Sequence, residues 1–199
     1  DLSMLQNPIH LRLEKLESWQ HVTFMASLCE RMYPNYAMFC QQTGFGDAHI
    51  YRRILDLVWE TLTVKDAKVN FDAQLEKFEE AIPVAEDYDI YGVYPAIDAC
   101  VALSDLLHAL LSGETCEQAV EVSKTSITTV CMLEMTQAGR EMTDDELKNN
   151  PSVEQEWDIQ WEIHRLLAAC EERDIELIKG LRADLREAGS SNIGINLQQ

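Results

Sequence analysis

The stretch Pro95–Leu111 reads PAIDACVALSDLLHALL and decides the fold. Its proline suits the first position of a helix, where the missing N–H needs no partner. Three polar residues, Asp98, Asp105 and His108, fall within about 80° of one another at ~100° per helical residue. Apart from Pro95 and Ser104, every other residue is Ala, Val, Ile, Leu or Cys. Such a helix is buried nearly all round and has one narrow polar stripe, so it predicts the centre of a helical bundle.

Helix formers dominate the rest of the chain as well. Of the 199 residues, 8 are Gly and 5 are Pro, which leaves few helix breakers. Hydrophobic residues make up 46% and charged residues 26%, a composition typical of soluble globular proteins. Apolar residues recur at helical spacing between turn signals. We therefore predict an all-α, single-domain helical bundle of about eight helices, the others lying near residues 8–16, 18–33, 35–42, 47–62, 66–78, 115–138, from 143, and 150–188.

Two helix boundaries follow from Pro and Gly. Pro34 is expected to end or kink the helix that starts at Ser18, because proline lacks the N–H and restricts the residue before it. Near the other end of the chain, Asn150 and the following proline begin a helix that continues to Ala188, before Gly189. This long C-terminal helix would span ~57 Å at 1.5 Å per residue. We expect its far half to project, or to pair with a second subunit in a homodimer.

The single helical domain is predicted to cover residues 4–189. Met4 leads directly into the first helix, so residues 1–3 are interpreted as a remnant that precedes the natural start. Residues 190–199 form a polar C-terminal tail that we expect to lie loosely. No secretory signal is visible, and no apolar run reaches the ~18 residues that a membrane span needs. We therefore expect a cytoplasmic protein that makes no membrane contact.

The charge balance constrains the partners. Asp and Glu number 35 against 16 Lys and Arg, which gives a net charge of −19. A chain of this charge repels nucleic-acid phosphates and anionic lipid, so we expect no direct nucleic-acid binding. This negative charge suits a basic protein partner. A weaker hypothesis is that the acidic surface mimics DNA and binds a DNA-binding protein. The simpler interpretation is that the charge serves solubility alone.

The six cysteines predict neither disulfides nor a zinc site. None of them forms a Cys-x-x-Cys pair, and most lie in apolar helical segments, such as Cys100 and Cys131. Free cysteine is among the most buried residue types. We interpret all six as reduced core thiols of a cytosolic protein.

The polar stripe of Pro95–Leu111 holds the candidate catalytic residues. Asp105 and His108 are three residues apart and share a helix face, and Asp98 lies two turns earlier. Together with His164 they could bind a metal or carry out acid–base chemistry inside a bundle. Di-iron bundles need paired Glu-x-x-His helices, and the sequence has no Glu-x-x-His. The plainer interpretation is a thin solvent-facing stripe, with His164 as a satisfied core histidine.

Two further groups of polar residues lie on helical faces. Four polar residues fall inside the apolar arc of the C-terminal helix: Glu156, Gln160, Glu171 and Asp174. There they would face a polar cavity or an interface, or would meet an Arg from a neighbouring helix. A structural ion pair is the preferred interpretation. The run Ser123–Thr129 has five hydroxyls in seven residues. No nucleophile elbow surrounds them, so hydrogen bonds within the helix and close helix packing are the expected roles.

Five stretches of the sequence resemble the YjaG-like family of uncharacterised bacterial cytoplasmic proteins. The resemblance covers nearly the whole chain from Met4. It implies an all-helical, bundle-like fold, and it implies no activity and no catalytic residues. The stretches that carry it are RMYPNY (31–36), GFGD (44–47), YGVYPAIDAC (91–100), SKTSITT (123–129) and QEWDIQWE (155–162).

The sequence leaves two functional hypotheses open. The first is a non-enzymatic acidic cytosolic protein that acts by binding another protein, which would be a basic one. The second is an enzyme or a metal-binding helical bundle that uses Asp98, Asp105, His108 and His164. No cofactor motif is present, since Gly44-Phe45-Gly46 lacks the third glycine and the preceding strand of a dinucleotide loop. No cofactor and no metal are therefore expected.

Overall fold

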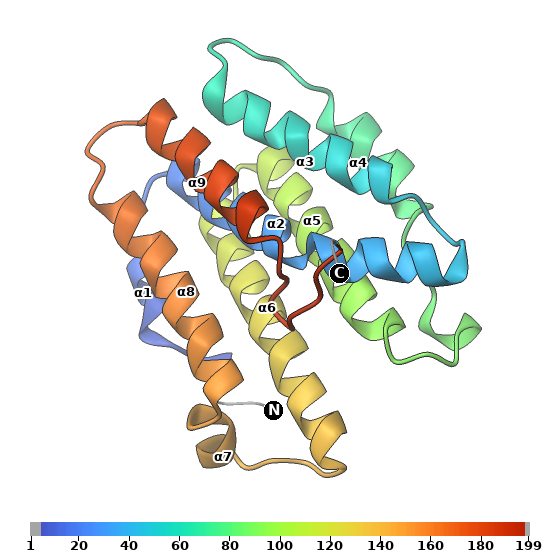
Figure 1. The fold of residues 1–199 in the computed structure, drawn as a ribbon. Helices are drawn as coiled ribbons and strands as arrows, with labels where there is room; N and C mark the ends of the chain where they lie inside the picture. Colours follow the sequence, from blue (N-terminus) through green and yellow to red (C-terminus); the bar gives the residue numbers. More distant parts are fainter. Residues whose placement is uncertain (1–4, 198–199) are drawn as a thin grey trace.

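The computed structural model describes residues 5–197, and in this range the chain forms α-helices, short 3-10 geometry and no β-strand. The all-α prediction is confirmed. The expected start at Met4 and the remnant at 1–3 lie outside the described residues. The helices, shown in Figure 1, are α1 (Pro8–Leu13), α2 (Ser18–Thr43), α3 (Ala48–Thr63), α4 (Phe71–Glu79), η2 (Ala85–Asp87), α5 (Val93–Ser112), α6 (Thr115–Ala138), α7 (Asp144–Lys148), α8 (Pro151–Ala168) and α9 (Ile175–Ala188).

Helix α5 lies at the centre, as its sequence predicts. It packs mainly against α2 and α6, and these two also pack against each other. Small residues such as Ala96 and Ala99 are fully buried there, which lets neighbouring helices approach closely. The helix ends at Gly113, which has a φ of 80°. Glycine adopts this left-handed conformation without strain because it has no side chain. By length and composition α5 could cross a membrane, and half of its most apolar window is buried among the other helices.

Helix α2 continues through Pro34, contrary to the expected end at that residue. It runs without a break for 26 residues from Ser18 to Thr43. A proline in a helix interior costs about 3 kcal/mol, mainly because one backbone hydrogen bond is lost. Met32 and Tyr36 on either side are both fully buried. The burial of these and many other side chains outweighs the cost of the proline, so the helix does not end.

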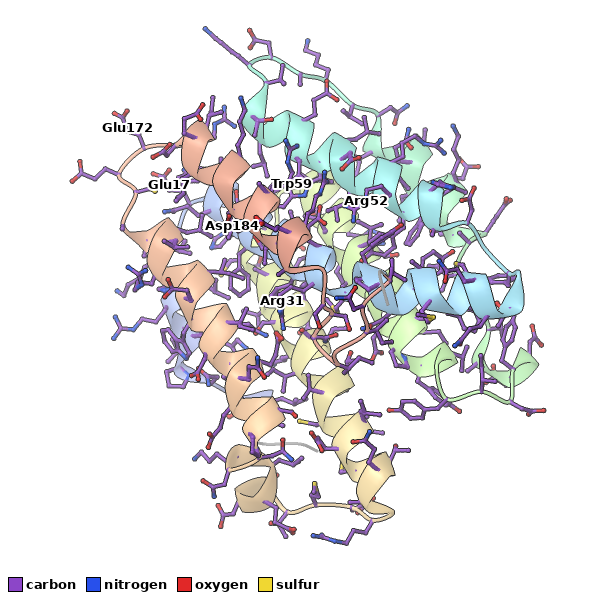
Figure 2. The ribbon with its side chains drawn as sticks, in the orientation of Figure 1. Glu17, Arg31, Arg52, Trp59, Glu172 and Asp184 are labelled. Carbon is purple, nitrogen blue, oxygen red and sulfur yellow. The ribbon has the colours of Figure 1, made fainter. Side chains whose placement is uncertain are left out.

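The long C-terminal helix is a wrong prediction. Two helices replace it, α8 and α9, and the chain reverses between them (Figure 1). Glu172 projects into solvent from this connection (Figure 2). Asp174 begins α9 by accepting a hydrogen bond from the N–H of Leu177. Reversal lets Ile178 and Leu181 of α9 enter the main core, against α2 and α3, whereas a projecting helix would leave them in water.

The chain beyond α9 is packed, although we expected a loose tail. Gly189 ends the helix with a φ of 68°, and the following residues return across α2 and α6 (Figure 1). Ser191 and Asn192 are buried. A turn closed by hydrogen bonds between Ser191 and Ile195 holds this segment together. The C-terminal segment, residues 190–197, is therefore part of the domain's structure.

Candidate functional site

Asp98 reaches from α5 to α6 and is partly buried. Its Oδ2 atom accepts a hydrogen bond of 2.8 Å from Oγ1 of Thr129. Burial raises the pKa of this carboxyl group to about 6, and the bond from Thr129 opposes that rise. The group therefore changes charge close to neutral pH, while the threonine holds it at the boundary between the two helices.

Asp105 and His108 share the stripe with Asp98, as predicted. Burial raises the pKa of Asp105 to about 6, the nearby Glu121 carboxylate adds to the rise, and His108 opposes it. His108 itself is exposed. The pair thus lies at the surface, where α5 passes α6.

His164 does not join the polar stripe formed by Asp98, Asp105 and His108. It lies on α8, its ring centroid is 5.6 Å from that of Trp161, and the charge of Arg12 on α1 contributes to lowering its pKa. Burial lowers its pKa, and its Nε2 atom is buried without a hydrogen-bond partner. None of the contacts of Asp98, Asp105 or His108 involves it. Across residues 5–197, no group of three or more His, Cys, Asp or Glu side chains is placed to hold a metal ion.

The stripe is part of a wider surface, the α5–α6 face. Three large apolar side chains are exposed on it: Tyr94 to 54%, Val101 to 39% and Met132 to 44%. Val101 lies in the middle of the predicted polar stripe, and Met132 lies on the neighbouring α6. The two helices contain a single Lys or Arg, Lys124, whose charge contributes to lowering the pKa of His10 on α1. We define the α5–α6 face as Tyr94, Asp98, Val101, Asp105, His108, Glu121, Thr125 and Met132.

The preferred interpretation of Glu156 is confirmed, because it forms a buried ion pair. Its side chain is 1% exposed, and its Oε1 atom lies 2.6 Å from Nη2 of Arg31 on α2. Its Oε2 atom accepts hydrogen bonds from Ser126 at 3.0 Å and from Gln160 at 3.3 Å. A buried carboxylate is tolerated when a cation and hydrogen bonds satisfy it, as they do here.

The hydroxyl run of α6 supplies structural hydrogen bonds rather than a nucleophile. Ser123 donates to Oε1 of Gln160 at 2.5 Å, and its Oγ atom lies 3.0 Å from Nε2 of His10. Burial, with a contribution from Lys124, lowers the pKa of His10 to about 4. A neutral histidine beside a serine would resemble a catalytic pair, but Ser123 is fully buried, so no substrate reaches it.

Asn192 extends this polar cluster, and sequence reasoning missed it. Its Nδ2 atom donates to the backbone carbonyl and to Oγ of Ser126, both at 3.1 Å. Its Oδ1 atom accepts from Nδ2 of Asn35 on α2 at 2.9 Å. An asparagine in a polar tail carries no periodic signal of burial, so the pattern of the sequence could not place it.

A second buried carboxylate, Glu30, also escaped sequence reasoning. Its Oε1 atom accepts from Trp59 at 2.9 Å, and its two oxygens pair with Arg52 and Arg186. Arg52 and Trp59 come from α3 (Figure 2), while Arg186 comes from α9 and also pairs with Asp56. This network joins α2, α3 and α9. It is fully satisfied and therefore structural.

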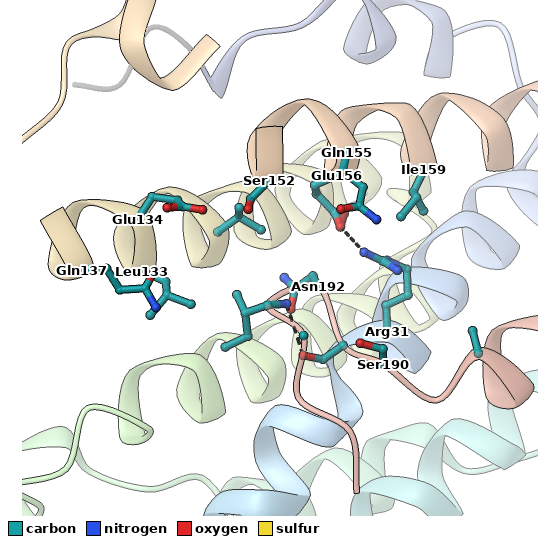
Figure 3. Close-up of a pocket in the computed structure, with 15 residues that line it drawn as sticks. Arg31, Leu133, Glu134, Gln137, Ser152, Gln155, Glu156, Ile159, Ser190 and Asn192 are labelled. Carbon is teal, nitrogen blue, oxygen red and sulfur yellow. Dashed lines mark hydrogen bonds and ion pairs between the residues drawn. The ribbon is translucent and has the colours of Figure 1, made fainter. Parts of the chain in front are cut away.

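A cavity of about 480 Å³ lies beside the Glu156 cluster. Its walls are α6, α8 and residues 188–194, and Arg31 of α2 closes one end (Figure 3). Glu134 lies at the opposite end in that view, and Asn192 lies between them. The cavity joins segments that are far apart in the chain, so only the folded structure reveals it.

These features define a class: a small all-helical protein, built round one apolar helix, with an acidic and partly apolar outer face. The chain belongs to the family described as "Protein of unknown function (DUF416)", whose model matches residues 8–196. The resemblance to the YjaG-like family is thereby confirmed.

Relatives of the chain match it over nearly its full length. It is 87% identical to "Uncharacterized protein YjaG" of Escherichia coli K12 and to the protein of that name in Salmonella typhimurium, over 98% of this chain and all of each relative. An "Uncharacterized protein" of Haemophilus influenzae is 54% identical over the same share. The crystal structure of a DUF416 family protein from Shewanella baltica superposes with a TM-score of 0.90, at 35% identity, covering 96% of this chain and all of that one.

Proposed function

We propose that the protein binds a basic, amphipathic segment of a partner protein through the α5–α6 face. The observation that carries the proposal is the exposure of Tyr94, Val101 and Met132 next to carboxylates, on a surface without Lys or Arg. Neighbouring exposed apolar side chains with a polar rim are typical of interaction sites. Apolar side chains of the partner would pack on these three residues, and its basic side chains would meet the carboxylates.

Charge complementarity supports a basic partner over a second copy. The net charge of −19 attracts cationic segments and accelerates their encounter with the protein. Two copies of the face would instead place Asp98, Asp105 and Glu121 against like charges. The expected homodimer also loses its basis, because the far half of the predicted long helix is α9, which packs on α2 and α3.

The alternative hypothesis was an enzyme or a metal-binding bundle. Asp98 and Asp105 have pKa values near 6, which suits proton transfer. They lie on an exposed helix face rather than in a closed pocket, and His164 contacts neither of them. We therefore favour the interaction role.

The test is a quantitative capture experiment with matched variants. The face variant carries Val101→Arg and Met132→Arg. The control carries Leu11→Arg and Val64→Arg, two other exposed apolar residues, which are exposed to 67% and 50%. Both variants change the net charge equally, and circular dichroism verifies their folding. We expect the wild type and the control to capture the same basic protein at low salt. The amount of that protein captured by the face variant should be lower by about tenfold or more.

Release of that protein by high salt would accord with an electrostatic contribution. The proposal is wrong if the two variants capture every protein to the same extent. A twofold mass in light scattering that the face variant abolishes would make the face a homodimer interface instead.

A further inference from the structure

A second pocket, of about 590 Å³, adjoins the α5–α6 face. The last turns of α6, the connection that follows and the start of α7 form its walls, and Figure 1 shows these segments at one end of the bundle. Three methionines line the pocket: Met132, Met135 and Met142. Its volume lies within the range of about 300 to 1,000 Å³ that is usual for ligand pockets. We call it the Met pocket.

The Met pocket is continuous with the α5–α6 face. Met132 belongs to both, and its side chain is exposed. Thr136 also lines the pocket, and its side chain forms a hydrogen bond with that of Tyr91. The ring centroid of Tyr91 is 5.7 Å from that of Tyr94, which is exposed on the face. A segment that lies along the face therefore reaches the pocket.

The floor of the Met pocket is apolar. Met135 and Met142 are partly buried and pack against a small core cluster to which α6, α7 and α8 all contribute. The cluster consists of Ile127, Val130, Cys131, Leu147 and Val153. Methionine side chains are flexible and polarisable, and their sulfur atoms make favourable contacts with aromatic rings. The pocket therefore suits a large aromatic side chain better than a polar one.

The charges at the Met pocket favour a basic ligand. Among the described residues that line it, Arg140 is the one Lys or Arg. Its guanidinium group donates to both carboxylate oxygens of Glu146, so its charge is balanced. Glu141 also lines the pocket and is exposed, which leaves the rim negative. A basic segment is attracted to this rim and an acidic one is repelled.

We propose that the Met pocket binds one large aromatic side chain, Trp or Phe, of the basic segment that lies on the α5–α6 face. This inference rests on the proposed function, and it adds a residue that the partner must have. The ring packs on Met135 and Met142, and basic side chains next to it meet Glu141. Aromatic side chains in such pockets commonly supply a large share of the binding energy of an interface.

Two synthetic peptides of about 20 residues, which are ~30 Å long as helices, test the aromatic anchor. Both place Lys and Leu on opposite faces of the helix, and one has Trp near its end where the other has Ala. Calorimetry on the full chain should show that the Trp peptide binds about tenfold more tightly. Isotope labelling of the methionine methyl groups then locates the ring by magnetic resonance, because an aromatic ring shifts the signals of the methyl groups that it covers.

The methyl signals of Met135 and Met142 should shift with the Trp peptide and not with the Ala peptide. Those of Met25 and Met32, which are fully buried in the main core, serve as internal controls. Equal shifts with both peptides, or shifts confined to Met132, would overturn the anchor and leave the proposed function standing. If neither peptide binds at roughly 1 mM, which is weak for a specific interface, both proposals are wrong.

A matched pair of variants separates contact with the ring from an effect on the fold. Met142→Ala should weaken binding of the Trp peptide several-fold and leave binding of the Ala peptide unchanged, because only the Trp peptide uses the pocket. Met38→Ala removes a partly buried methionine of α2 outside the pocket, and it should bind both peptides like the wild type. If Met142→Ala weakens both peptides equally, it acts through the fold and the proposal is overturned.

Discussion

The carboxylate of Glu156 is almost completely buried, and one guanidinium group, that of Arg31, balances its charge. Removal of one partner of a buried ion pair leaves an uncompensated charge, whereas joint replacement of both does not. At the scale of single residues, this asymmetry predicts how the core responds to substitution.

Arg31→Met should lower the free energy of unfolding by about 3 to 5 kcal/mol, because the charge of Glu156 is left unpaired. Addition of Glu156→Gln to this variant should restore much of the loss, since the neutral amide keeps a hydrogen bond with Ser126. Urea unfolding followed by circular dichroism measures both. A loss below about 1 kcal/mol for Arg31→Met would show that water or another group compensates the charge.

Asp98 predicts a dependence of stability on pH. Burial raises its pKa from the ordinary 3.8 of an aspartate side chain to about 6 in the folded protein, so the folded state holds the proton more strongly. Its contribution to stability is therefore full below about pH 4 and is lost as the pH rises through about 6. Asp98→Asn, which cannot ionise, should be more stable than the wild type by about 1 to 3 kcal/mol at pH 8. The difference should vanish at pH 4, and thermal unfolding at both values checks it; a difference independent of pH would contradict the assignment.

At the scale of elements, the connection between α8 and α9 depends on a local signal. The side chain of Asp174 accepts from the N–H of Leu177 and begins α9 there. Asp174→Ala should cost about 1 kcal/mol and speed amide hydrogen exchange in the first turn of α9, because one helix cap is lost. Glu172→Ala in the same connection caps nothing and serves as the control. Equal exchange in both variants would mean that packing of Ile178 alone positions α9.

Prediction from the sequence succeeded for elements with a local signal. It failed where the packing of distant segments determines whether a helix continues or ends. The apolar run around Ala99 identified α5, and the spacing of Asp98 and Asp105 placed them on one face. Pro34 is a strong local signal for a helix end, yet its buried surroundings override it. Asp174 is an equally good cap signal that the apolar periodicity of α8 and α9 masked.

The candidate site was predictable only in part. The ion pair of Glu156 followed from a charged residue in an apolar arc, although the identity of Arg31 did not. Asn192 and the cavity depend on contacts between α2, α6 and the C-terminal segment, which no periodicity encodes. The apolar half of the α5–α6 face was also missed, because Val101 fits a buried helix as well as an exposed one.

At the scale of the whole molecule, the net charge predicts electrostatic self-repulsion. A net charge of −19 on 199 residues disfavours the compact state. An increase of salt from about 20 to 200 mM shortens the range of this repulsion, and it should raise the melting temperature by about 2 °C or more. Scanning calorimetry at constant pH measures the change. A lower melting temperature at high salt would mean that the ion pairs of Glu30 and Glu156 outweigh the repulsion.

The bond between Asn35 and Asn192 joins residues 157 positions apart. During synthesis on the ribosome, α2 emerges long before the segment that completes its polar contacts. A nascent chain that has α2 and α6 but not yet residue 192 leaves the amide of Asn35 without its partner, and it also lacks α9 over the core. The native arrangement can therefore form only late in translation, and until then the flank of α2 that α9 covers stays exposed to solvent.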